Sequence, residues 1–189
     1  MSNYTVATLP RLSATKLSEL LLSQSSASAN LDAPAPASNI AIVDHPTDET
    51  PDHIGGHIRH SIHAPSSTLD FKIPELVRKL KDRETVVFHC ALSQQRGPSA
   101  ALRYIRERQR ILSLPAHLEG GSGVGEVLKK NAEDGMSGEK DADGEWEDAG
   151  SKEQKVYVLD RGFVGWQERF GEDTRLTEGY RREIWKDGY

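Results

Sequence analysis

The 189-residue chain has a single cysteine, and aromatic side chains make up only 6% of it. One cysteine cannot form an internal disulfide, so we expect the chain in a reducing compartment, the cytoplasm and/or the nucleus. No apolar run approaches the roughly 20 residues that span a bilayer. The first residues also lack the charged and apolar regions of a signal peptide. We therefore expect no membrane partner.

Basic charge is not concentrated on any segment either, and the net charge is -5. A nucleic-acid partner is thus not expected, because such proteins carry clustered lysine and arginine. The acidity is concentrated in residues 115–155, where five basic residues stand against eleven acidic ones, a balance of -6. This segment has almost no apolar residues at the regular spacing of a helix or a strand. It is therefore predicted to be a disordered acidic insertion within one folded domain that comprises residues 1–189.

Outside that segment, apolar patterns predict short strands separated by helices. The expected strands are 4–8, 39–43, 59–62, 85–88 and 156–159, and the expected helices follow Ser13, start at Pro74, cover 99–109 and close the chain at 177–185. Strands that alternate with helices form parallel βαβ units. The predicted fold class is therefore α/β, with a parallel sheet covered by helices on both faces.

The cysteine follows one of these strands directly. Cys90 comes just after strand 85–88, Arg96 stands six positions later, and Gly97-Pro98 opens the next helix. A loop that leads into a helix N-terminus directs backbone N–H groups at one point and so binds an oxyanion and favours a thiolate. Arg96 can add two parallel donors. The alternative is a buried structural cysteine, which is common after an apolar strand.

The motif His89-Cys90-x-x-Ser93-x-x-Arg96-Gly97-Pro98 resembles the active-site loop of the mitotic-inducer (cell-division-cycle) dual-specificity phosphatases. It is equally similar to that of the eukaryotic arsenate reductases, which share the same rhodanese-like domain, and small plant and fungal members are most alike. Residues 42–44, 55–65 and 158–166 resemble further parts of that domain, and the likeness extends over about 5–110 and 155–170.

The resemblance implies a rhodanese-like five-stranded parallel sheet flanked by helices, with Cys90 as nucleophile and Arg96 as anion clamp. The substrate-binding amides that it implies are those of Ala91, Leu92, Ser93, Gln94, Gln95 and Arg96. Three positions depart from the family pattern. Pro46 replaces an arginine, Gln95 replaces an acidic residue beside the loop arginine, and Arg161 stands where a second glycine is common.

Metal and cofactor sites are not expected. Related plant proteins can carry extra cysteines for zinc, and this chain has none; its histidines, which gather mainly between residues 45 and 63, are interpreted as structural or surface residues. The general acid stays unassigned. Asp44 and Asp160 are the nearest candidates at the sheet edge, and both are interpreted as structural rather than catalytic.

Three functions remain open at this stage. The first is a protein tyrosine or dual-specificity phosphatase that forms a cysteinyl-phosphate, acting on a phosphorylated protein or a small oxyanion. The second is an arsenate reductase that uses glutathione as co-substrate together with glutaredoxin, which needs no second cysteine in the chain. The third is a non-catalytic module that binds an oxyanion or phosphotyrosine. A sulfurtransferase is disfavoured, because those relatives have a loop one residue shorter.

Overall fold

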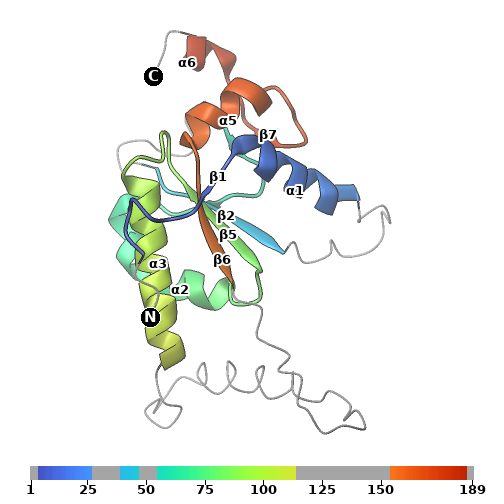
Figure 1. Ribbon diagram of the computed structural model, residues 1–189. Coiled ribbons are helices and arrows are strands. Elements are labelled where there is room, and N and C mark those ends of the chain that lie inside the picture. Colours follow the sequence, from blue (N-terminus) through green and yellow to red (C-terminus); the bar gives the residue numbers. More distant parts are fainter. Residues whose placement is uncertain (1–3, 27–38, 47–54, 114–153, 187–189) are drawn as a thin grey trace, which may run out of the picture.

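The computed structural model describes residues 4–26, 39–46, 55–113 and 154–186 (Figure 1). The predicted acidic insertion lies outside these residues except for its last two positions. In chain order the elements are β1 (Arg11–Leu12), α1 (Ala14–Ser26), β2 (Ile40–Asp44), β3 (His57–Ile58), β4 (Ile62–His63), the 3-10 helix η1 (Ser66–Thr68), α2 (Leu69–Lys79), β5 (Thr85–His89), α3 (Arg96–Ser113), β6 (Lys155–Leu159), α5 (Gly162–Phe170), β7 (Thr177–Glu178) and α6 (Arg182–Lys186).

Five of the strands form one sheet in the order β1-β6-β5-β2-β4. Every neighbouring pair in this sheet is parallel. The remaining strands, β3 and β7, pair antiparallel as a small separate ribbon. The predicted five-stranded parallel sheet is thereby confirmed, and its carboxyl edge, where α/β sheets bind ligands, lies at the ends of β5 and β2.

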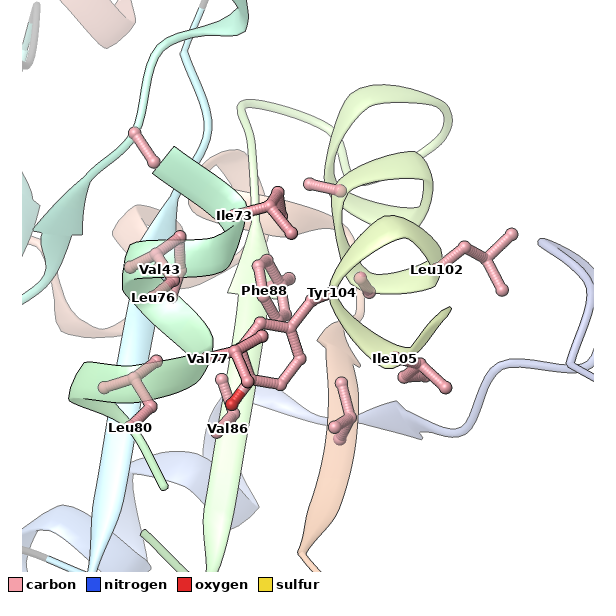
Figure 2. Close-up of a cluster of buried hydrophobic side chains, with 14 of the residues drawn as sticks. Val43, Ile73, Leu76, Val77, Leu80, Val86, Phe88, Leu102, Tyr104 and Ile105 are labelled. Carbon is pink, nitrogen blue, oxygen red and sulfur yellow. The ribbon is translucent and has the colours of Figure 1, made fainter. Parts of the chain in front are cut away.

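Helices cover both faces of the sheet (Figure 1). Successive residues of a strand point to opposite faces. Val86 and Phe88 of β5 accordingly pack on one side with α2 and α3, as Figure 2 shows, where Leu76 and Tyr104 also lie. Val87 points to the other side and packs with residues of α1 and α5. This burial on both faces explains why the strands read as continuous apolar runs.

Two residues assigned to the insertion belong to the folded body. Gln154 is buried, and its side-chain amide donates to the carbonyls of Leu80 and Arg83 at 2.7 Å each. Its side-chain oxygen accepts from the Tyr104 hydroxyl at 2.8 Å. Lys155 is the first residue of β6. The polar composition of the preceding segment concealed this boundary, because a buried glutamine carries no apolar signal. Burial also raises the pKa of Tyr104 to about 12.

Other element boundaries differ from the predicted ones for local reasons. Residues 4–8 form a turn rather than a strand, since the side chains of Thr5 and Thr8 bond to each other's backbone amides. Pro74 lies inside α2 and not at its start, so the helical hydrogen bond from position 74 to the carbonyl of Asp70 cannot form. The predicted helix 177–185 is mostly absent, because its first residues form β7 and only 182–186 are helical.

Candidate active site

The cysteine loop lies at the carboxyl edge of the sheet, as its sequence position predicted. Strand β5 ends at His89, and helix α3 begins at Arg96, three residues earlier than expected. The neighbouring strand β2 is in register at this edge, with Asp44 opposite His89. Directly after it, the His45 amide donates to the His89 carbonyl at 2.8 Å. Residues 90–95 therefore connect two well-fixed elements.

The Cys90 sulfur faces the interior of this loop. The residue is 3% exposed, and its Sγ accepts from the Ser93 amide at 3.2 Å. Ser93 has a φ of +53°, a left-handed conformation that serine seldom adopts, and this turn brings its amide to the sulfur. The sulfur therefore lies within hydrogen-bond reach of a backbone donor, in a loop that leads into the N-terminus of helix α3.

Two further polar atoms at the loop have no hydrogen-bond partner within the described part of the chain. They are Ser93 Oγ and Arg96 Nη1, and both are buried. A buried donor without a partner carries a desolvation penalty, so such atoms commonly mark a ligand position. Together with the Cys90 sulfur they define a cationic, donor-rich site, which suits a tetrahedral oxyanion.

The other predicted binding residues stand at the rim. Ala91 is half-buried, whereas Leu92, Gln94 and Gln95 are exposed. Their side chains therefore do not fill the space around the sulfur, and their contribution to binding would come from the backbone. The sequence-based assignment of the whole loop as substrate-binding remains a prediction.

Helix α5 holds the first part of the loop from the side opposite α3. The amides of Phe163 and Val164 donate to the carbonyls of Cys90 at 3.0 Å and Ala91 at 2.9 Å. Gly162 makes this approach possible, because a Cβ on it would lie 2.3 Å from the Cys90 oxygen. Gly162 also has a φ of +55°. No pattern in the sequence points to these two amides, although Arg161-Gly162 directly after a strand indicates a tight turn.

His89, the last residue of β5, supports the loop where it begins. Its side chain is fully buried, with Nδ1 3.4 Å from Asp44 Oδ1, and its ring stacks on Phe163 at a centroid distance of 6.5 Å. Gly97 allows α3 to approach closely, since a Cβ there would lie 3.2 Å from the His89 backbone. His89 is thus packed between Asp44 and Phe163, where it holds the start of the loop in place. This packing also turns the Asp44 carboxylate toward His89.

A second buried histidine stands next to the loop and was not anticipated as part of the site. His45 Nδ1 donates to the Ala64 carbonyl at 2.5 Å. Burial lowers the pKa of His45, and the positive charge of Arg96 lowers it further, while the bond to Ala64 acts in the opposite direction. The lowered pKa of His45 disfavours a second positive charge beside Arg96.

Asp160, the other acid considered, lies beside an arginine from the first strand. Its Oδ1 is 3.6 Å from Arg11 Nη1, and its side chain is half exposed. The same Arg11 nitrogen donates to the Ser93 carbonyl at 3.3 Å. Among the described residues, no three histidine, cysteine, aspartate or glutamate side chains group in a way that could hold a metal ion. None of the described helices is long and apolar enough to cross a membrane.

The fold is that of a rhodanese-like α/β domain, with a buried cysteine in the loop at the carboxyl edge of its sheet. Searches with protein-family models gave no match. The dual specificity phosphatase Cdc25 of Arabidopsis thaliana is 49% identical over 67 residues, which cover 35% of this chain and 44% of that protein. The Cdc25-like phosphatase YCH1 of Saccharomyces cerevisiae is 29% identical over 71% of this chain and 72% of its own.

A plant arsenate reductase and a solved yeast structure are similar to the chain as well. The arsenate reductase 2.2 of rice, Oryza sativa, is 33% identical over 59% of this chain and 58% of that protein. The crystal structure of yeast Ygr203w, described as a homologue of single-domain rhodanese and the Cdc25 phosphatase catalytic domain, superposes with a TM-score of 0.56. It is 26% identical, with 98% of this chain and 97% of that one covered. The chain is thus similar in sequence to Cdc25-like phosphatases and to plant arsenate reductases, the two groups that its motif resembles.

Proposed function

We propose that the chain is a cysteine-dependent protein tyrosine or dual-specificity phosphatase. The observation that carries this proposal is the position of the Cys90 sulfur, 3.2 Å from the Ser93 amide, in the loop that also holds the unpartnered Arg96 Nη1. A thiolate nucleophile and a fixed cation for the equatorial oxygens are the two components that phosphoryl transfer to cysteine needs.

In the proposed reaction, the Cys90 thiolate attacks phosphorus in line, and the bond to the ester oxygen breaks. That oxygen leaves with a proton, and water then attacks the cysteinyl-phosphate and releases inorganic phosphate and the thiolate. Arg96 and the loop amides stabilise the charge on the phosphoryl oxygens in both steps. No carboxylate of the chain is assigned as the acid, since Asp44 is turned to His89 and Asp160 to Arg11. A proton carried by the substrate would serve.

Arsenate reduction is the second candidate, and the rice homologue favours it. Arsenate has the same tetrahedral shape and charge as phosphate, so it would occupy the same loop. Cys90 would attack arsenic and displace one oxygen as water. Glutathione would then release arsenite and leave a disulfide with Cys90, which glutaredoxin and a second glutathione would reduce, so the second thiol need not come from this chain. A site that retains the loop but turns over poorly would instead act as an oxyanion-binding or phosphotyrosine-binding module.

The remaining assignments are proposals of the same kind. We infer that residues 1–189 act as one catalytic domain, without a metal or cofactor, on a phosphorylated protein or a small oxyanion in the cytoplasm and/or nucleus. The presence of a single cysteine among 189 residues supports this compartment, because such chains need no disulfide. Cellular fractionation of the tagged chain would test it directly.

The deciding experiment compares wild type with Cys90→Ser. Both are assayed for hydrolysis of an aryl phosphate and for arsenate reduction with glutathione and glutaredoxin. Phosphate release that depends on Cys90, without arsenate turnover, identifies the phosphatase, and the reverse identifies the reductase. Binding of vanadate without either turnover identifies the binding module. A normal rate in Cys90→Ser would refute the proposed site.

A further inference from the structure

We propose that Arg11 is a positioning residue of the oxyanion site, which it orients through the Ser93–Gln94 peptide. This inference rests on the proposed function, since it concerns the same loop. Arg11 is 82 positions away from Ser93 in the sequence, yet its Nη1 donates to the Ser93 carbonyl at 3.3 Å. No loop motif includes Arg11.

Arg11 holds the Ser93–Gln94 peptide, which follows a residue with a strained backbone. Ser93 has a φ of +53°, so its backbone is in a conformation that serine adopts only when its surroundings enforce it. Its own amide is directed at the Cys90 sulfur. The carbonyl on the other side of the residue is directed at Arg11. Arg11 thus supplies an external contact that favours this strained turn.

Orientation of the carbonyl also decides the orientation of the next amide. The peptide group is planar, and a trans peptide directs its C=O and N–H to opposite sides. No peptide bond among the described residues is cis. When Arg11 holds the Ser93 oxygen, the Gln94 N–H must therefore point away from Arg11. We infer that it then faces the oxyanion position beside Arg96, as one of the donors that the proposed chemistry needs.

Arg11 is itself held in two ways, by the pairing of its strand with β6 and by the carboxylate of Asp160. Strand β1 pairs with β6, with Arg11 in register with Val158, and the Asp160 amide donates to the Leu12 carbonyl at 2.8 Å. The Asp160 carboxylate lies 3.6 Å from the same Nη1. With its side chain 41% exposed, this ion pair contributes little to stability, so its main effect is to place the guanidinium.

The experiment measures phosphate affinity without requiring turnover. Cys90 is the only thiol of the chain, so alkylation by iodoacetamide reports on it alone. Inorganic phosphate in the loop protects it, and the protection curve gives a dissociation constant. We expect Arg11→Met to weaken phosphate binding about tenfold, as for the loss of about one hydrogen bond to a charged group. Arg11→Gln should weaken it in the same direction.

The matched control is Arg169→Met. Arg169 also connects distant segments, donating to Thr15 Oγ1 at 2.9 Å, and its replacement removes the same charge away from the loop. It should leave the affinity unchanged. The loss in Arg11→Met should persist at high salt, because a displaced amide is not restored by screening whereas a long-range charge effect disappears. Urea unfolding of each variant verifies that the fold is retained.

The outcomes separate this inference from the proposed function. Wild-type affinity in Arg11→Met, or a loss that disappears at high salt, would overturn the role of Arg11 even if wild type is an active phosphatase. A tenfold loss at both salt concentrations supports that role even if wild type turns over neither phosphate esters nor arsenate. Absence of phosphate protection in wild type would overturn both.

Discussion

Replacement of Gly162 by alanine should damage the loop more than replacement of any other glycine that the structure describes. The added Cβ would lie 2.3 Å from the Cys90 oxygen and 2.5 Å from the Ala91 oxygen, where real contacts are not under 3.0 Å. Neither atom belongs to a flexible side chain, so the loop and helix α5 must separate. The φ of +55° adds strain of its own.

The expected loss in the free energy of unfolding follows from the contacts that break when α5 and the loop separate. Two hydrogen bonds connect α5 to the loop, from the amides of Phe163 and Val164. Each contributes about 1 kcal/mol net. A non-glycine residue at positive φ costs about 1 kcal/mol more. The free energy of unfolding of Gly162→Ala should therefore fall by about 3 kcal/mol.

Gly179 provides a matched control. It also has a positive φ, +64°, but a Cβ there would meet nothing within 4 Å. Gly179→Ala should thus lose only the conformational part, about 1 kcal/mol. Urea unfolding gives both values, and phosphate protection of Cys90 from iodoacetamide should weaken in Gly162→Ala alone. Equal behaviour of the two variants in both assays would refute the clamping role of α5.

Three further predictions concern other parts of the chain. Burial lowers the pKa of His45 in the folded chain, so below pH 6.5 the unfolded chain binds a proton at His45 more readily than the folded chain does. As the pH falls below 6.5, the free energy of unfolding of wild type should therefore decrease more steeply than that of His45→Gln, which urea titrations at several pH values measure. Tyr104→Phe leaves the buried Gln154 oxygen without its donor and should cost about 1–3 kcal/mol in urea unfolding, with Tyr157→Phe on β6 as control. Excision of residues 115–153 with a short Gly-Ser linker should leave kcat/KM unchanged.

Each of these has a contrary result. Parallel pH profiles for wild type and His45→Gln would mean that His45 keeps its ordinary pKa in the fold. A loss in Tyr104→Phe no larger than in Tyr157→Phe would mean that water replaces the lost hydroxyl. A drop in kcat/KM on excision, at unchanged stability, would give the acidic segment a part in catalysis; excision that also removes Gln154 serves as the destabilised comparison.

The sheet and the loop were predictable because both are encoded in continuous stretches of sequence. Strands such as 85–88 consist of neighbouring apolar residues, and the loop from His89 to Arg96 is eight consecutive positions. Arg11 could not be found in this way, since it stands 82 residues before its partner and β1 is only two residues long. Gly162 shows a local turn signal, but only tertiary structure reveals what its missing Cβ would strike.

The hydrogen bonds from α5 to the loop mean that the cysteine–arginine motif does not form the site by itself. Every residue from His89 to Pro98 lies before residue 113, whereas the amides that hold the carbonyls of Cys90 and Ala91 come from beyond residue 160. A polypeptide truncated after α3 would keep the complete cysteine–arginine signature and lose both those amides and strand β6 beside β5. Recognising the signature in a shortened gene product or a proteolytic fragment is therefore no sign of a working site.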